Sequence, residues 1–491
     1  MSKLRSYTKA CIRFVLWAAM AVSLSAQTFE MLRGFDSTNG AFPWAPLVQA
    51  SDGNFYGTAT NGGNPACVWS GGYYSGCGTV FQITPSGKLT TIFFFDGTNG
   101  SFPLAGLVQA ANGNFYGTTS DGGTGNFEGL CPNNCGTIFT ITPSGTLTTL
   151  YNFSYTDGAY PAGAALILGS DGNYYGTTSG GGAVNAGTFF VMTPSGTLTT
   201  LYTFTGGDDG AAPYGGLIQT LDGNFYGTTW TGGANQFGTV FTFTPNGTLT
   251  TLHTFDNTDG SYPYAGLVQL DGGDFYGVTE EGGTYNYGTV FKINLSGKLT
   301  TLYSFSGGLD GDTPVSTLIR ATDGNLYGTA SYDGLYPNFG TVFEITPSGE
   351  LTTLFNLDST DGSYPYAALV QATNGGFYGA TFGGGSGARK GNCKYFGCGE
   401  VFSLSVGLGP FVETVPTSGN VGAAVRILGT DLKGATSVTF NGTAATFAVL
   451  SKSEIETSVP PGATAGPVRV TTTVKGTKNT LKSNTTFQVT E

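Results

Sequence analysis

Seven copies of a short motif, FYG or a close variant, run through most of the chain and restrict it to a repeat architecture. The motif glycines are Gly57, Gly117, Gly176, Gly227, Gly277, Gly328 and Gly379. The later intervals between them are 50 or 51 residues, and the first two are 60 and 59. A unit of about fifty residues in seven copies predicts a β-propeller or a solenoid.

The fourth copy has the pattern of four short strands joined by turns. The expected strands span residues 216–220, 225–229, 238–244 and 248–255. Asp-Gly-Asn at 222–224 and Pro-Asn-Gly at 245–247 are tight-turn signals. Four antiparallel strands per unit are typical of a propeller blade, whereas a β-solenoid would have shorter repeats without hairpins at these two places. No segment shows a sustained helical period.

The two ends of the repeat region complement each other. Residues 28–35 (TFEMLRGF) have the pattern of a fourth strand, whereas the last copy stops after its third strand, residues 400–405 (EVFSLS). We expect the N-terminal strand to complete the last blade, because this pairing removes strand edges that invite aggregation. The sequence therefore predicts an all-β fold in which residues 28–406 form a seven-bladed β-propeller of four-stranded blades.

The repeated unit resembles a known family. Its segments DGNFYGTT, GTVFxITPSGxLTTLYxF and DGxxP are similar to the GloVer tandem repeats of secreted bacterial "choice-of-anchor" proteins, over Thr28 to about Val406. The resemblance implies export and a propeller-like repeat fold. It implies no catalytic motif and no particular biochemical activity.

A second domain follows a short linker at residues 407–411. Residues 412–491 alternate short apolar strands with Gly and Pro, which predicts a small β-sandwich. The run SVTFNGTAATFAVLSKSEIETSVPPGATAGPVRV resembles the IPT/TIG immunoglobulin-like domain. The resemblance implies a spacer or contact module, and the segment contains no cysteine pair of the antibody type.

Residues 1–26 have the layout of a secretory signal peptide. Four basic residues come first: Lys3, Arg5, Lys9 and Arg13. An apolar run from Phe14 to Leu24 follows, and the small residues Ser25 and Ala26 mark the expected cleavage region. A membrane anchor, the competing interpretation, needs about 20 apolar residues. We expect a secreted or cell-surface bacterial protein with no transmembrane segment in its mature chain.

The cysteines fall into close pairs within loops. Cys11 belongs to the leader, and the pairs are Cys67 with Cys77, Cys131 with Cys135, and Cys393 with Cys398. In an oxidising compartment such pairs predict local disulfides, each removing roughly 2–3 kcal/mol of loop entropy from the unfolded chain. Zinc binding is the alternative, but zinc needs about four ligands and the single histidine is far away in sequence. We therefore expect disulfides, no metal and no cofactor.

Loops of variable length predict the position of a site. The loops after the second and fourth strands of each blade emerge on one face, the variable face, and the uniform DGN and PSG hairpins on the other, the hairpin face. The cysteine-bearing loops of copies one, two and seven are neighbours in a closed ring and form a predicted disulfide rim. Its candidate ligand-binding residues are Trp69, Tyr73, Tyr74, Phe127, Phe382, Arg389 and Tyr395, with Lys390 and Phe396 nearby. These aromatic side chains either stack on a ligand or cover their own loops.

Acidic residues and the histidine offer weaker signals. The Asp-Gly loops at Asp157, Asp209, Asp259 and Asp361, with Asn39 and Asn99 at the equivalent place in the first two copies, fit turn formation better than Ca²⁺ binding. His253 stands where other copies carry tyrosine, which indicates packing, and no catalytic residue is assigned. Glu280 and Glu281 are the adjacent glutamates of one variable-face loop, and paired carboxylates are the minimum that a glycosidase requires.

The net charge of the chain limits the classes of partner that it can bind. The formal net charge of −12 disfavours nucleic acid, because an acidic surface repels phosphate. The leading prediction is a monomeric, non-catalytic binding protein whose variable face recognises an extracellular glycan or protein. A purely structural surface repeat protein is the first alternative, and a carbohydrate-active propeller enzyme is the second.

Overall fold

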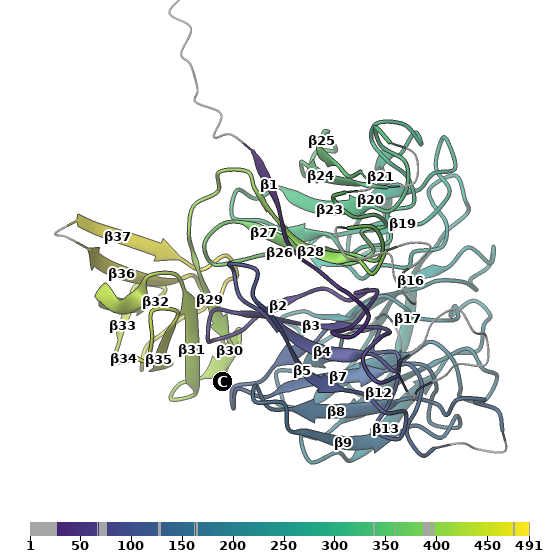
Figure 1. Cartoon of the computed structure of the whole chain (residues 1–491), viewed down its shortest axis with the longest axis horizontal. Coiled ribbons are helices and arrows are strands. Elements are labelled where there is room, and N and C mark those ends of the chain that lie inside the picture. The colour runs from purple at the N-terminus through teal and green to yellow at the C-terminus, as the bar shows by residue number, and fades with distance from the viewer. Residues whose placement is uncertain are drawn as a thin grey trace, which may run out of the picture.

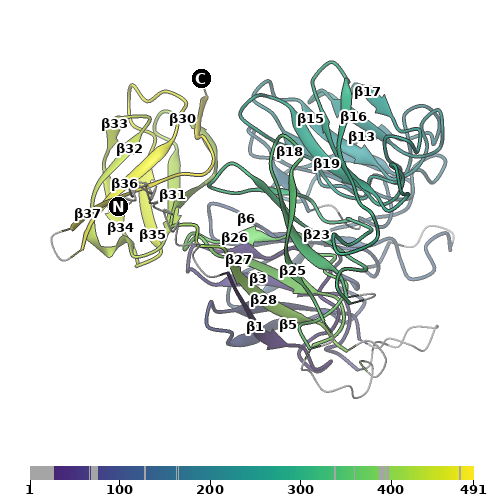
Figure 2. The ribbon, with the colours of Figure 1, turned by 90° about the horizontal axis from the view of Figure 1, so that it is seen from above.

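A computed structural model describes residues 27–65, 67, 76–125, 129–161, 163, 165–336, 339–358, 360–385, 393, 397–474 and 477–490. Within these ranges the chain forms seven four-stranded antiparallel sheets, followed by a C-terminal β-sandwich (Figure 1). The predicted all-β class, the seven-bladed propeller and the immunoglobulin-like sandwich are confirmed. Figure 2 shows the sandwich, in yellow-green, standing to one side of the blades.

The first four blades follow one another along the chain, each in the order of its strands. Blade 1 contains β2 (Val48–Gln49), β3 (Phe55–Ala59), β4 (Thr79–Ile83) and β5 (Leu89–Phe94). Blade 2 contains β6 (Val108–Gln109), β7 (Phe115–Thr119), β8 (Thr137–Ile141) and β9 (Leu147–Asn152). Blade 3 contains β10 (Ile167–Leu168), β11 (Tyr174–Thr178), β12 (Thr188–Met192) and β13 (Leu198–Thr203). Blade 4 contains β14 (Ile218–Gln219), β15 (Phe225–Thr229), β16 (Thr239–Phe243) and β17 (Leu249–Thr254).

Blades 5 and 6 follow the same strand order, whereas the last blade is built from both ends of the repeat region. Blade 5 contains β18 (Val268–Gln269), β19 (Phe275–Thr279), β20 (Thr289–Ile293) and β21 (Leu299–Ser304). Blade 6 contains β22 (Ile319–Arg320), β23 (Leu326–Ala330), β24 (Thr341–Ile345) and β25 (Leu351–Asn356). Blade 7 contains β26 (Val370–Gln371), β27 (Phe377–Thr381), β28 (Glu400–Ser405) and, beside β28, the N-terminal β1 (Thr28–Gly34). The predicted ring closure by the N-terminal strand is therefore confirmed.

Aromatic stacking between blades explains why FYG recurs. At six of the seven junctions the tyrosine of one motif lies against the first aromatic residue of the next, with ring centroids 4.1–4.3 Å apart, and at the seventh the next motif begins with Leu326. The pairs are Tyr56–Phe115, Tyr116–Tyr174, Tyr175–Phe225, Tyr226–Phe275, Tyr327–Phe377 and, across the closure, Tyr378–Phe55. Such pairs contribute about 0.5–1.5 kcal/mol each beyond the area they bury. The motif therefore joins the blades to one another.

Polar side chains add hydrogen bonds at the same junctions. The glutamine of a two-residue inner strand accepts a backbone N–H from the preceding blade, as Gln109 does from Ser51 at 3.1 Å. Gln49 does the same for Thr373 at 2.8 Å, although 324 residues separate the two. The ring is therefore closed by this bond and by the Tyr378–Phe55 stack as well as by strand pairing.

The sandwich has two four-stranded sheets. One contains β29 (Val412–Val415), β31 (Ala424–Gly429), β35 (Glu454–Ser458) and β34 (Phe447–Val449). The other contains β33 (Thr443–Ala445), β32 (Ala435–Phe440), β36 (Val468–Val474) and β37 (Thr477–Lys482). A short 3-10 turn η2 (Leu432–Gly434) precedes β32, and β30 (Ser418–Asn420) pairs in parallel with β38 (Gln488–Thr490). Its core includes Val425, Ile427, Phe440, Ile455, Val470 and Phe487.

The sandwich contacts the hairpin face of the propeller. Ser453 Oγ donates to the carbonyl of Ser51 in the first hairpin of blade 1, at 3.1 Å. In blade 7 the carbonyl of Thr373 accepts from the N–H of Phe411, which is buried, at 3.0 Å. Asn484 Nδ2 donates to the carbonyl of Arg320 in blade 6, also at 3.0 Å. The second domain therefore occupies the face opposite to the variable loops.

Glu413 on β29 gives a pH-dependent prediction. Burial raises the pKa of its carboxyl from 4.5 to about 7, so the folded state prefers the neutral acid. This cost is absent below pH 4.5, grows between pH 4.5 and 7 and is complete above pH 7, where it reaches on the order of 3 kcal/mol. We expect Glu413→Gln to raise the free energy of unfolding in urea at pH 8 and to leave it nearly unchanged at pH 4. The exposed Glu456→Gln is the control, and an equal gain at both pH values would contradict the prediction.

Candidate functional site

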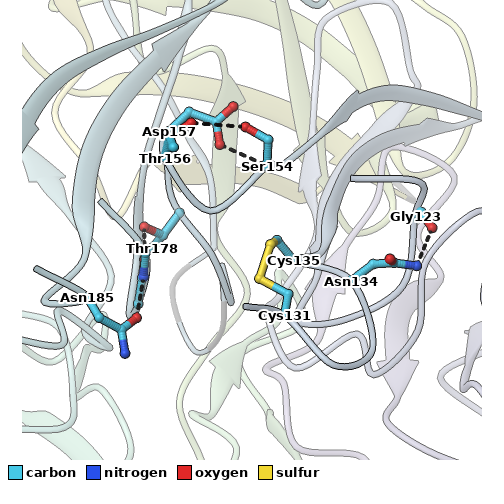
Figure 3. Close-up of a disulfide and its surroundings, with 11 residues drawn as sticks. Gly123, Cys131, Asn134, Cys135, Ser154, Thr156, Asp157, Thr178 and Asn185 are labelled. Carbon is cyan, nitrogen blue, oxygen red and sulfur yellow. Dashed lines mark hydrogen bonds between the residues drawn. A yellow bond between two sulfur atoms is a disulfide. The ribbon is translucent and has the colours of Figure 1, made fainter. Parts of the chain in front are cut away.

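All three predicted disulfides form. Cys67–Cys77 lies between β3 and β4, Cys131–Cys135 between β7 and β8, and Cys393–Cys398 between β27 and β28, with Cα atoms 5.6, 5.3 and 4.9 Å apart. Figure 3 shows Cys131–Cys135 beside Asn134, whose side-chain amide donates to the carbonyl of Gly123 at 2.7 Å. Buried Cys131 and Cys135 belong to a hydrophobic cluster shared by blades 2 and 3. This disulfide therefore fastens its loop to the blade.

Most aromatic residues of the predicted disulfide rim lie outside the described residues. They are Trp69, Tyr73, Tyr74, Phe127, Tyr395 and Phe396, and the same holds for Arg389 and Lys390. Phe382 is described, and it stacks on Phe42 with ring centroids 4.7 Å apart and meets Trp44 edge-on at 5.5 Å. Phe382 thus joins a group of aromatic residues that the sequence pattern did not predict.

Trp44 of that group also lines a pocket on the variable face, which we call the central pocket. Its volume is about 460 Å³. Residues from blades 1 to 5 line it: Trp44, Leu104, Ser120, Tyr160, Ser179, Gly180, Asn185, Tyr214 and Tyr264. Because the lining comes from five blades, the pocket is a product of ring closure.

One repeated loop builds the walls of the central pocket. In each copy the residue before the loop proline has a positive φ, between 53° and 58°, and it is Tyr262 in blade 5. Tyr262 donates its N–H to the carbonyl of Phe237 in blade 4 and accepts from the N–H of Glu280. Positive φ is costly for a large side chain, and these two bonds hold it in place. The residue after the proline, here Tyr264, lines the pocket.

The residue after that proline is what differs between copies. In order along the chain it is Trp44, Leu104, Ala162, Tyr214, Tyr264, Val315 and Tyr366. The rings of Tyr214 and Tyr264 stack with centroids 4.8 Å apart, and those of Trp44 and Tyr366 stack at 4.3 Å. The repeat thus fixes the backbone while the side chains vary, which gives a constant frame an asymmetric aromatic lining.

A carboxylate lies among these rings. The indole N–H of Trp230 donates to Glu280 Oε2 at 3.0 Å, and Trp230 also meets Tyr214 edge-on at 5.8 Å. Burial raises the pKa of Glu280, and the nearby Glu281 raises it further. Burial is likewise the main cause of the raised pKa of the Tyr264 hydroxyl, with Tyr214 and the Glu280 charge adding to it. Glu280 is therefore linked to the pocket lining through Trp230.

The two adjacent glutamates do not act as a pair. Glu280 is half-buried against Trp230, whereas the Glu281 side chain is exposed and its backbone pairs with Ser261. A glycosidase needs two carboxylates that face the same bond. The arrangement of these two residues gives no support to a glycosidase site.

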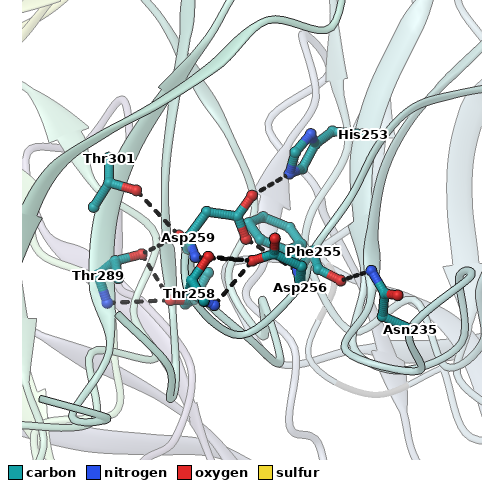
Figure 4. Close-up of polar contacts among 9 residues, drawn as sticks. Asn235, His253, Phe255, Asp256, Thr258, Asp259, Thr289 and Thr301 are labelled. Atoms are coloured by element: carbon teal, nitrogen blue, oxygen red, sulfur yellow. Dashed lines mark hydrogen bonds and ion pairs between the residues drawn. The ribbon is translucent and has the colours of Figure 1, made fainter. Parts of the chain in front are cut away.

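The Asp-Gly loops use their carboxylates to hold the turns. Tyr202 and Tyr303 each donate a hydroxyl to the loop aspartate of their blade, Asp209 and Asp310, at 3.0 Å. Figure 4 shows His253 in the corresponding role, with Nε2 2.7 Å from Asp259 Oδ2. Across the described ranges no group of three or more His, Cys, Asp or Glu residues is arranged to hold a metal ion.

In the portion of the chain that the structure describes, no helix is both long and apolar enough to traverse a bilayer.

Solved structures with a similar arrangement are distant. An auxiliary nutrient binding protein from Bacteroides thetaiotaomicron is 12% identical, with a TM-score of 0.38 over 63% of this chain and 69% of its own. One from Bacteroides ovatus is 11% identical, with a TM-score of 0.38 over 76% and 99%. A luciferin-regenerating enzyme is 11% identical, with a TM-score of 0.40 over 79% and 98%. Likeness at this level says nothing about ligands, and no curated protein matches the chain.

Family profiles match nearly the whole chain. The profile of the Gloeobacter/Verrucomicrobia repeat matches residues 18–161, 65–273 and 268–444, and that of the IPT/TIG domain matches residues 411–489. The overlapping repeat matches cover the seven blades, and the second match covers the sandwich. The chain belongs to the Gloeobacter/Verrucomicrobia repeat family and carries an IPT/TIG domain at its C-terminus.

Proposed function

We propose that this protein binds an extracellular glycan in the central pocket and that the C-terminal sandwich serves as a spacer or contact module. The observation that carries the proposal is the lining itself, in which Tyr214 stacks on Tyr264 and Trp44 is backed by Tyr366, a stacked neighbour outside the lining. Aromatic faces beside a few hydrogen-bonding groups suit the apolar face and hydroxyl edge of a sugar ring. Ser120, Ser179 and Asn185 supply such polar groups in the same pocket.

Two further features support a binding role. One residue per blade is held at positive φ in the loops that carry the pocket lining in blades 1 to 5, and strained backbone of this kind clusters at ligand sites. The sandwich contacts the hairpin face, so it leaves the central pocket accessible. Export, which residues 1–26 are proposed to direct, agrees with three disulfides that persist best in an oxidising compartment.

Removing the stacked tyrosines of the central pocket is expected to weaken glycan binding. A glycan array identifies ligands of the mature protein, and calorimetry then compares the intact protein with the double variant Tyr214→Ala/Tyr264→Ala. We expect the double variant to bind roughly 5- to 150-fold more weakly, because the two stacked rings together contribute about 1–3 kcal/mol. Far-UV circular dichroism and urea unfolding establish that the variant remains folded.

Two control variants locate the binding. Tyr285→Ala removes an exposed tyrosine of the variable face that does not line the pocket, and we expect unchanged affinity. Trp69→Ala/Tyr73→Ala/Tyr74→Ala tests the predicted disulfide rim in the same assay. Normal affinity in the Tyr214/Tyr264 variant, or loss confined to the rim variant, would place the site elsewhere; no glycan binding by the intact protein would refute the proposal.

A further inference from the structure

Charge is distributed unevenly between the two faces of the propeller. Within its described residues the basic side chains are Arg33, Lys88, Lys292, Lys298 and Arg320. Lys88 and Lys298 stand in PSG-type hairpins. Lys292 pairs with Asp274 and Arg320 with Asp271, and both aspartates belong to one DGN-type hairpin. Four of these five basic residues therefore belong to the hairpin face. Arg33 lies on the outermost strand, β1, next to Asp36.

Acidic side chains border the central pocket. Asp121 follows Ser120, which lines the pocket, and burial raises the pKa of Asp121 to about 6. Its charge also acts on the hydroxyl of Tyr160, another lining residue. The lining itself contains no lysine or arginine. The sequence also contains Arg389, Lys390 and Lys394 before β28, outside the described residues.

The Glu280 carboxylate can accept more hydrogen bonds than the one it receives from Trp230. A carboxylate offers about four lone-pair positions. In the described chain the hydrogen bond to its side chain is the one that Trp230 donates to Oε2. The carboxylate is half-buried beside Trp230, whose ring meets Tyr214 of the pocket wall edge-on. A cation that arrived there would therefore gain both an ion pair and the faces of electron-rich rings.

We propose that the glycan bound in the central pocket carries free, protonated amino groups, with an ammonium directed to Glu280 and a sugar face against Tyr214 and Tyr264. This inference rests on the proposed function, since it names the glycan class of the same pocket. Uronic acids and sulfated sugars are disfavoured by like charge from Glu280 and Asp121. Acetylation of the amine removes the cation and leaves the ring, so N-acetylated sugars lose the ion pair but keep the stacking.

Three probes that share a β-1,4-linked backbone test the inference: the hexamers of glucosamine, N-acetylglucosamine and glucose. Calorimetry at about pH 6.5 and low salt compares them on the intact protein. We expect the glucosamine hexamer to bind at least tenfold more tightly than the other two, and this preference to shrink as salt is raised. Equal affinity for the three, or tighter binding of an uncharged probe, would overturn the inference and leave the proposed function standing.

Matched variants assign the preference to one side chain. Glu280→Gln should abolish the preference for the glucosamine hexamer, whereas Glu281→Gln, which makes the same charge change at the exposed neighbour, should retain it. Tyr214→Ala/Tyr264→Ala should weaken every probe that binds. A preference that survives in Glu280→Gln would overturn the assignment. Failure of all three probes overturns the amino-sugar inference, and the glycan array then decides separately whether the pocket binds another glycan.

Discussion

A chain that starts at Phe35 and lacks β1 is expected to lose its monomeric native state and to aggregate. β1 pairs with β28 from Thr28↔Ser405 to Gly34↔Glu400, and Phe29 stacks on Phe355 of blade 6 and on Phe402. Its removal exposes the backbone edge of β28 and unpacks blade 7 from blade 6. The strand pairing and ring stacking that β1 provides are comparable in free energy with the net stability of a domain, which is about 5–15 kcal/mol.

Size-exclusion chromatography with light scattering measures this effect. The control is a chain that starts at Gln27, which retains β1 and is expected to be a stable monomer. A synthetic peptide covering residues 27–35, added in trans, should restore solubility to the truncated chain by filling the vacant edge. A truncated chain that stays monomeric with an unchanged urea midpoint would show that the ring does not depend on this closure.

Gly227→Ala is expected to destabilise the propeller by about 1–3 kcal/mol, although alanine suits a strand at least as well as glycine does. A Cβ at Gly227 would lie 2.7 Å from Phe241 Cζ and 3.0 Å from Leu217 Cδ2. Phe241 is fully buried and Leu217 nearly so, so neither ring nor methyl group has room to retreat. The same close approach recurs in every copy of the FYG motif, as at Gly57 against Phe81 and Leu47.

Gly216→Ala provides the matched control in the same blade. A Cβ at Gly216 would meet no atom within 4 Å, and the backbone there does not have a positive φ. Urea unfolding of the two variants separates the steric effect from the general effect of replacing glycine. We expect Gly216→Ala to be neutral or slightly stabilising. A similar loss of stability in both variants would refute the steric explanation of the motif glycine.

Strand order was predictable because its signals are local. Residues 225–229 and 400–405 were expected as strands and are β15 and β28. Residues 216–220 were expected as a strand of five residues, but β14 keeps only Ile218 and Gln219. β14 is an edge strand of its sheet, and it pairs with its one neighbour, β15, only over Ile218↔Tyr226 and Gln219↔Phe225.

The reason for the FYG motif was not predictable in the same way. Its tyrosine and first aromatic residue have the pattern of ordinary strand residues within one copy. Their partners lie in the adjacent copies, as with Tyr226 against Phe275. Only when the blades are placed side by side does each motif become half of a stacked pair.

The candidate site likewise has features that local sequence predicts and features that depend on how the blades assemble. Local patterns predict loops of variable sequence on one face, and three cysteine pairs predict three disulfides, because turn chemistry and short loop closures depend on neighbouring residues. The central pocket depends on Trp44, Tyr214 and Tyr264, with Tyr366 stacked on Trp44, and these residues lie far apart in sequence. Their shared signal is a position directly after the loop proline of each copy, at which the residue type changes. Ring closure alone brings these positions around one axis, so the pocket is decided by tertiary structure.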